Sequence, residues 1–83
     1  MSVVQCVKRQ SSGSNKVDMW FQFPTKETVR FSIYLEQDTV EQIVKDYKNE
    51  LLPKYPHYRE YMDSFTHTLT QVWPIKVGRF LAM

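Results

Sequence analysis

The most informative part of this 83-residue chain is KVDMWFQFPTKETVRFSIYLEQDTVEQIVKDYKNELL, residues 16–52. Apolar residues occupy alternate positions in two runs within it, 17–23 and 29–35. A period of two residues is typical of strands that bury one face. The sequence therefore predicts two strands, joined as a β-hairpin by the short polar segment between them.

The two strands of this hairpin can pair in either of two registers. Their apolar faces must coincide, so directly opposed residues share parity, and Phe21 then faces either Phe31 or Val29. The connecting residues 24–27 (PTKE) contain neither Asn-Gly nor any glycine that would fix a two-residue turn. The sequence leaves both registers open.

An amphipathic helix is predicted after the hairpin. Asp38 stands at the N-cap position and Glu41 follows three residues later, which is the spacing of a capping box. Apolar residues then recur at helical spacing until Pro53 ends the run: Val40, Ile43, Val44, Tyr47 and Leu51. We expect this stripe to pack on the hairpin around a core formed by Phe21, Phe31, Ile33, Ile43 and Val44.

The segment before the hairpin, residues 1–15, has two interpretations. Its valines and Cys6 form either a short strand that joins the sheet or a loose N-terminal arm. The SSGSN sequence after them, residues 11–15, is predicted to be a flexible loop. Nothing in the sequence separates the strand from the arm.

The segment after the main helix, residues 53–83, is predicted to add a short helix and then strand structure. Apolar residues at helical spacing indicate a helix over 56–65. The β-branched residues of 66–73 indicate a strand, and 75–81 indicate a further extended piece beyond Pro74. The whole chain is predicted to form a single domain.

Composition limits the kind of protein this can be. The chain is 42% hydrophobic and 14% aromatic, so it can fill a packed core. Its one cysteine, Cys6, excludes an internal disulfide and indicates a reducing, intracellular location, which we expect to be the cytoplasm. No run approaches the roughly 18 apolar residues that a membrane span needs, so we expect no membrane association.

No pattern typical of an active site or a metal site is present. His57 and His67, the only imidazoles, lack a metal-ligand spacing, and Cys6 lacks the flanking residues typical of a catalytic thiol. The chain has 2 glycines, too few for a phosphate-binding loop. We expect no metal, no cofactor and no enzymatic activity.

Residues 16–52 resemble the first half of the ubiquitin-like β-grasp family. There too a hairpin leads into a helix capped by an acid-Thr-apolar-Glu sequence, which here is Asp38-Thr39-Val40-Glu41. The second half departs from the family, with a predicted extra helix in place of the short third strand and no Gly-Gly tail, so conjugation is not implied. The resemblance implies a non-catalytic domain that binds other proteins through a sheet face.

The predicted fold class is α+β, with the hairpin packed on the main helix and the C-terminal helix and strand added to them. A β-grasp-like arrangement is favoured by the resemblance. A ferredoxin-like fold or another α+β sandwich is the alternative.

The outward-facing residues of the hairpin are the candidate binding site: Trp20, Gln22, Arg30, Ser32 and Tyr34. Trp, Tyr and Arg supply most of the binding energy of interfaces, whereas a solvated sheet face normally carries smaller polar residues. We therefore predict an adaptor, inhibitor or assembly domain whose partner is another protein or a second copy of itself. The competing interpretation is that residues 66–81 or the second helix cover this face and make it a structural core.

A small nucleic-acid-binding domain is the alternative function. Single strands are held by aromatic stacking and by phosphate contacts to cations, for which the candidates are Lys8, Arg9, Lys16, Lys76 and Arg79. The net charge is only +2 and the region of the main helix is acidic. Protein binding is therefore the favoured function.

Overall fold

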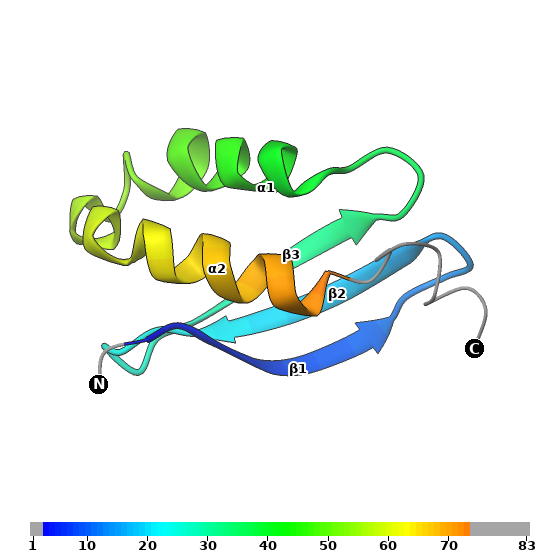
Figure 1. The fold of residues 1–83 in the computed structure, drawn as a ribbon, viewed down its shortest axis with the longest axis horizontal. Helices are drawn as coiled ribbons and strands as arrows, with labels where there is room; N and C mark the ends of the chain where they lie inside the picture. Colours follow the sequence, from blue (N-terminus) through cyan, green and yellow to red (C-terminus); the bar gives the residue numbers. More distant parts are fainter. Residues whose placement is uncertain (1–2, 74–83) are drawn as a thin grey trace.

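Three strands follow one another along the chain in the computed structural model, which describes residues 3–73. They are β1 (Gln5–Ser11), β2 (Lys16–Gln22) and β3 (Thr28–Tyr34), and they form an antiparallel sheet in the order β1-β2-β3. Two helical segments follow and lie against one face of this sheet (Figure 1). The predicted α+β class is confirmed, and the segment before the hairpin is a strand rather than a loose arm.

The turn between β2 and β3 selects one of the two predicted registers, the one in which Phe21 pairs with Val29. The Phe23 N–H donates to the Glu27 carbonyl (2.8 Å), and the Lys26 N–H donates back to the Phe23 carbonyl (2.8 Å). Lys26 adopts φ 78°, the left-handed conformation that closes a three-residue hairpin loop. This loop geometry excludes the alternative register.

The main helix begins one residue later than predicted. α1 (Val40–Asp46) is capped by Thr39, whose Oγ1 accepts a 3.2 Å hydrogen bond from the Gln42 N–H. Asp38, the predicted N-cap, instead accepts a 2.8 Å hydrogen bond from the Tyr34 N–H, because it lies in the turn that follows β3. The prediction of Asp38 as the helix cap is therefore wrong, and its carboxylate closes the end of a strand.

α1 continues into one wider helical turn, η1 (Tyr47–Leu51), in which the Leu52 N–H donates to the Tyr47 carbonyl (3.2 Å). A hydrogen bond across five residues is that of a π-helix. Tyr47 is fully buried in this turn, and its hydroxyl donates to the Tyr58 carbonyl. The helical segment therefore ends just before Pro53, as the sequence predicts.

A second helical segment consists of a 3-10 turn, η2 (Pro56–Tyr61), and the helix α2 (Met62–Val72). The strand predicted over 66–73 is wrong, because residues 66–72 belong to α2. Two of its threonine hydroxyls donate 2.8 Å hydrogen bonds to carbonyls four residues earlier, so these β-branched residues are accommodated in a helix. The extended piece predicted over 75–81 lies outside the described residues.

Both helical segments pack on the same face of the sheet, and the core lies between them and β2. Phe23 stacks on Tyr58 with ring centroids 4.5 Å apart, and Phe65 packs against Tyr47 at 4.7 Å. The almost completely buried members of the core are Val4, Val17, Met19, Phe21, Phe23, Ile33, Ile43, Tyr47, Tyr58, Phe65 and Leu69.

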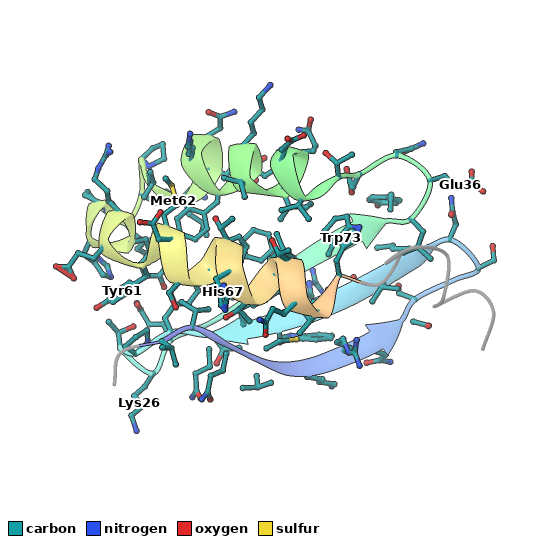
Figure 2. All side chains as sticks on the ribbon, in the orientation of Figure 1. Lys26, Glu36, Tyr61, Met62, His67 and Trp73 are labelled. Atoms are coloured by element: carbon teal, nitrogen blue, oxygen red, sulfur yellow. The ribbon has the colours of Figure 1, made fainter. Side chains whose placement is uncertain are left out.

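The core predicted from the sequence is right in part. Phe21, Ile33 and Ile43 are buried as expected. Phe31 and Val44 are half-buried at the margin, where they pack against the buried residues. Side chains of the helices and of the sheet fill the space between the ribbons (Figure 2).

The first strand and the last helix are tied together through Val4. Its N–H donates to Ser64 Oγ (2.8 Å), and Thr68 Oγ1 donates to its carbonyl (2.7 Å). These two bonds hold the start of β1 against α2. Segments from both ends of the described chain therefore share one core.

Candidate functional site

The hairpin register places all five predicted binding residues on the sheet face opposite the helices. The side chains of β2 that point toward the helices are buried, so those at the intervening positions point the other way. Their cross-strand partners on β3 share this face, which gives the pairs Lys16–Tyr34, Asp18–Ser32, Trp20–Arg30 and Gln22–Thr28. We call these residues, together with Lys8 of β1, the outer sheet face.

Among residues 3–73, no helix or loop is packed over the outer sheet face. Phe65 and Leu69, the buried residues of α2, belong to the core on the opposite face. The interpretation in which the second helix or residues 66–73 cover Trp20 is therefore wrong for the described chain (Figure 1). Residues 74–81, which that interpretation also invoked, lie outside the described part.

Each aromatic residue of this face has a cation beside its ring. Lys8 Nζ lies 4.7 Å from the ring centroid of Trp20, and Lys16 Nζ lies 5.6 Å from that of Tyr34. Arg30 stands directly across from Trp20 on β3. Cation–π contacts at such sites contribute about 0.5 to 1 kcal/mol each, so they hold the ammonium groups beside the rings. The indole is half-buried, whereas the phenol of Tyr34 is 43% exposed.

The one carboxylate of the outer sheet face is held by a neighbour. Ser32 Oγ donates a 2.8 Å hydrogen bond to Asp18 Oδ1 across the two strands. Lys8, Lys16 and Arg30 therefore outnumber a single acid that already has a hydrogen-bond partner. The face is positively charged around two aromatic rings.

The structure brings together only some of the cations proposed for nucleic acid. Lys8 and Lys16 lie on the outer sheet face with Trp20. Arg9 pairs with the buried Met19, so it belongs to the other face of the sheet. Lys76 and Arg79 lie outside the described residues.

Sequence reasoning did not include Lys8 in the protein-binding set. The pairing of β1 with β2 shifts between Cys6 and Lys8, and this bulge sets Lys8 opposite Trp20. No local sequence signal marks the bulge, since Val7 and Lys8 are ordinary strand residues. Alternation alone would assign the residues after the bulge to the wrong faces.

Groups with other chemistry lie apart from this face. Burial raises the pKa of the Cys6 thiol, which lowers its thiolate fraction at neutral pH. His57 Nε2 lies 3.4 Å from Glu27 Oε1 beside the β2–β3 turn. Within residues 3–73, no group of three or more His, Cys, Asp or Glu side chains could hold a metal ion.

Comparison with models of known protein families, with curated proteins and with solved structures found no match to this chain. The helices of residues 3–73 are too short or too polar to cross a membrane. The outer sheet face is the candidate binding site among the described residues.

Proposed function

We propose that this protein is a non-catalytic interaction module that binds a partner protein through the outer sheet face. The main support is the position of Trp20, which lies half-buried between Lys8 and Arg30. The described residues leave this sheet face uncovered. Such a domain serves as an adaptor, as an inhibitor of a larger partner, or as a piece of an assembly.

Energetics support this use of the face. Trp, Tyr and Arg are the residue types in which binding energy concentrates, because a partner that excludes water from them gains apolar burial and directed polar contacts together. Trp20, Arg30 and Tyr34 lie on adjacent strands of one sheet, which holds them in fixed positions. Little ordering entropy is then lost when a partner binds.

Charge indicates the chemistry of the partner. The outer sheet face carries one carboxylate, Asp18, and three cations: Lys8, Lys16 and Arg30. A complementary partner surface therefore carries acidic side chains around an apolar centre. The apolar centre would contact Trp20. Acidic groups around it would speed encounter with this face and fix orientation on it.

Nucleic acid is the second candidate, because aromatic rings and cations on an open sheet face also suit a single strand. Two observations favour a protein instead. The ammonium groups of Lys8 and Lys16 lie over the rings that bases would stack on. Arg9, a predicted phosphate contact, belongs to the other face of the sheet.

The resemblance of residues 16–52 to the ubiquitin-like β-grasp family is part of this proposal, since that family binds partners through a sheet face. It is supported by the order of hairpin and capped helix. Here a further strand, β1, precedes the hairpin and a second helix, α2, follows. The binding proposal does not depend on membership of that family.

Solvent access to Trp20 is the first test. The chain has 2 tryptophans, so Trp73→Phe leaves Trp20 as the only indole. Acrylamide should quench its fluorescence efficiently in the free protein, and the bound partner should protect it. Slow quenching in the free protein would show that the face is structural.

Partner capture is the second test. The wild type, Trp20→Ala, Arg30→Ala and Lys45→Ala should be cross-linked in cells and purified with and without nuclease. Lys45 is an exposed base on α1, so its variant controls for the loss of a charge. We expect Trp20→Ala and Arg30→Ala each to weaken binding of one captured protein by about 2 kcal/mol or more. Lys45→Ala should bind the same protein as tightly as the wild type. Capture that disappears with nuclease would favour the second candidate.

A further inference from the structure

The free edge of β3 adjoins a groove on the helix side of the sheet, which shares only Arg30 and Ser32 with the outer sheet face. In the described part of the chain β3 pairs only with β2, so its other side has no strand beside it. A cavity of about 210 Å³ lies between this edge and the helical segment α1–η1. Its lining includes Val29, Phe31, Ile43, Asp46, Glu50 and Leu51.

The hydrogen-bonding groups of β3 alternate between its two sides. The bonds from Phe23 N to Glu27 O and from Leu35 N to Asn15 O mark the two ends of the ladder with β2. Bonded pairs recur every second residue in an antiparallel ladder, so they fall at the odd-numbered positions of β3. The N–H and C=O of the even-numbered positions consequently point to the free edge.

Three residues on this edge have backbone groups without partners among residues 3–73. Tyr34, at the end of β3, uses its outward groups in the following turn: its N–H donates to Asp38, and its carbonyl accepts from Gln37 and Asp38. The outward N–H and C=O of Thr28, Arg30 and Ser32 make no such bond. They are spaced two residues apart, as the rungs of an added strand require.

The floor of the groove is apolar and its rim is acidic. Phe31, Ile43 and Leu51 supply buried or half-buried side chains beneath the strand edge. Asp46 and Glu50 stand four residues apart on the helical segment, so they share one side of it. Neither carboxylate forms an ion pair within residues 3–73. The rim therefore attracts a cation.

We propose that the edge of β3 binds an extended segment of a partner protein as an added strand. Alternate side chains of this segment are apolar and enter the groove, and a Lys or Arg at one end contacts Asp46 and Glu50. The backbone of Arg30 and Ser32 supplies the hydrogen bonds, and the groove supplies specificity, as in other cases of strand addition.

A second copy of this chain is a poor occupant of the same edge. Two β3 strands related by a two-fold axis would bring the Asp46 and Glu50 rims of both copies toward each other, which is unfavourable for like charges. The edge of β1 is a poor site as well. It carries the bulge between Cys6 and Lys8, and bulges impair strand pairing.

The test uses the full-length protein to select from a random eight-residue peptide library displayed on phage. We expect enriched peptides to alternate apolar residues and to carry a Lys or Arg. The most enriched peptide should slow hydrogen exchange at the Arg30 and Ser32 amides, measured by NMR. The same peptide with N-methyl groups at alternate amides should bind at least tenfold more weakly, because the methyl groups block pairing with a strand.

A charge reversal tests the acidic rim. Glu50→Lys should weaken binding of the basic peptide about two- to fivefold, as expected for a partly exposed ion pair. Glu60→Lys makes the same charge change on the exposed surface of η2, outside the groove, and should leave affinity unchanged. Equal effects of the two variants would refute the contact with the rim.

Three outcomes would overturn the proposal. They are no enrichment of any peptide, unchanged exchange at Arg30 and Ser32 in the presence of an enriched peptide, and dimerisation through β3 in sedimentation experiments. Trp20→Ala, in contrast, should keep peptide affinity within twofold. The strand-edge proposal and the outer-face proposal can therefore fail independently.

Discussion

The Tyr58 hydroxyl donates a 2.8 Å hydrogen bond to Glu27 Oε1 and so connects η2 to the turn between β2 and β3. The same carboxylate oxygen accepts a 2.7 Å hydrogen bond from Thr25 Oγ1 and lies 3.4 Å from His57 Nε2. The bond from Thr25, then that from Tyr58, lowers the pKa of the Glu27 carboxyl below its usual value of 4.5. Folding therefore favours the charged form of Glu27.

This lowered pKa predicts how Glu27→Gln changes stability with pH. A carboxyl with a depressed pKa in the folded state stabilises the fold above its unfolded-state pKa, and that contribution disappears as pH falls through the folded-state value. The wild type should be more stable than Glu27→Gln at about pH 7, and the difference should shrink as pH falls below 4.5. Urea unfolding across this pH range measures it.

A change at Tyr58 tests the hydrogen bond between Tyr58 and Glu27 independently. Tyr58→Phe removes a donor to Glu27, so the pKa of this carboxyl should rise toward 4.5 in an NMR titration. An unchanged pKa would show that Thr25 and His57 account for the shift without Tyr58.

Thr39→Ala should lower the free energy of unfolding by about 0.5 to 2 kcal/mol, because the Gln42 N–H loses its capping acceptor. Thr39→Ser keeps the hydroxyl and serves as the control. Denaturant titrations of both variants give the comparison. Equal losses would mean that the Thr39 methyl group, rather than the cap, carries the effect.

Ile43→Ala should cost about 2 to 5 kcal/mol of stability, because Ile43 is almost completely buried between α1 and the sheet. Val44→Ala, at the half-buried margin of the core, should cost distinctly less. Chemical denaturation distinguishes these outcomes. A loss below 1 kcal/mol for Ile43→Ala would contradict the packing of α1 on the sheet.

Lys26→Gly should stabilise the protein by about 0.5 to 1 kcal/mol. Lys26 has a positive φ of 78°, which costs a residue with a Cβ roughly 1 to 2 kcal/mol, and glycine removes this cost at the price of more unfolded-state freedom. Its side chain lies at the tip of the turn, away from the core (Figure 2). Lys26→Ala keeps the strain and should bring no gain in a thermal unfolding experiment.

The buried face of the hairpin was predictable because a strand alternates regardless of what packs on it. Val17, Met19 and Phe21 are all buried as their period of two indicates. The register was not predictable, because it depends on Lys26 in a conformation that lysine disfavours. The tertiary fold overrides the local preference at that residue.

The second helix illustrates a conflict between two sequence signals. Thr66, Thr68 and Thr70 favour a strand by composition, whereas Phe65 and Leu69 continue a helical apolar stripe. The stripe prevails because both apolar residues enter the core, and the threonine hydroxyls find acceptors in the helix and at Val4. Periodicity over a longer window would have given the correct element.

The candidate site also has a part that the sequence predicts and a part that it does not. Parity alone places Trp20, Arg30 and Tyr34 on one face, since it needs only the pairing of β2 with β3. Lys8 and the groove beside β3 depend on a bulge and on the path of a helix, which are set by packing between distant segments. Sequence patterns of short range carry no information about either.

The two hydrogen bonds of Val4 have a consequence for synthesis of the chain. They join residues 60 and 64 positions apart, so a nascent chain that has emerged only through η2 has all three strands but lacks Ser64 and Thr68. Without Phe65 and Leu69, part of the apolar side of β2 would remain in contact with water. The domain therefore completes its folding only after α2 leaves the ribosome, and a product terminated before that helix should be recognised by proteases as unfinished.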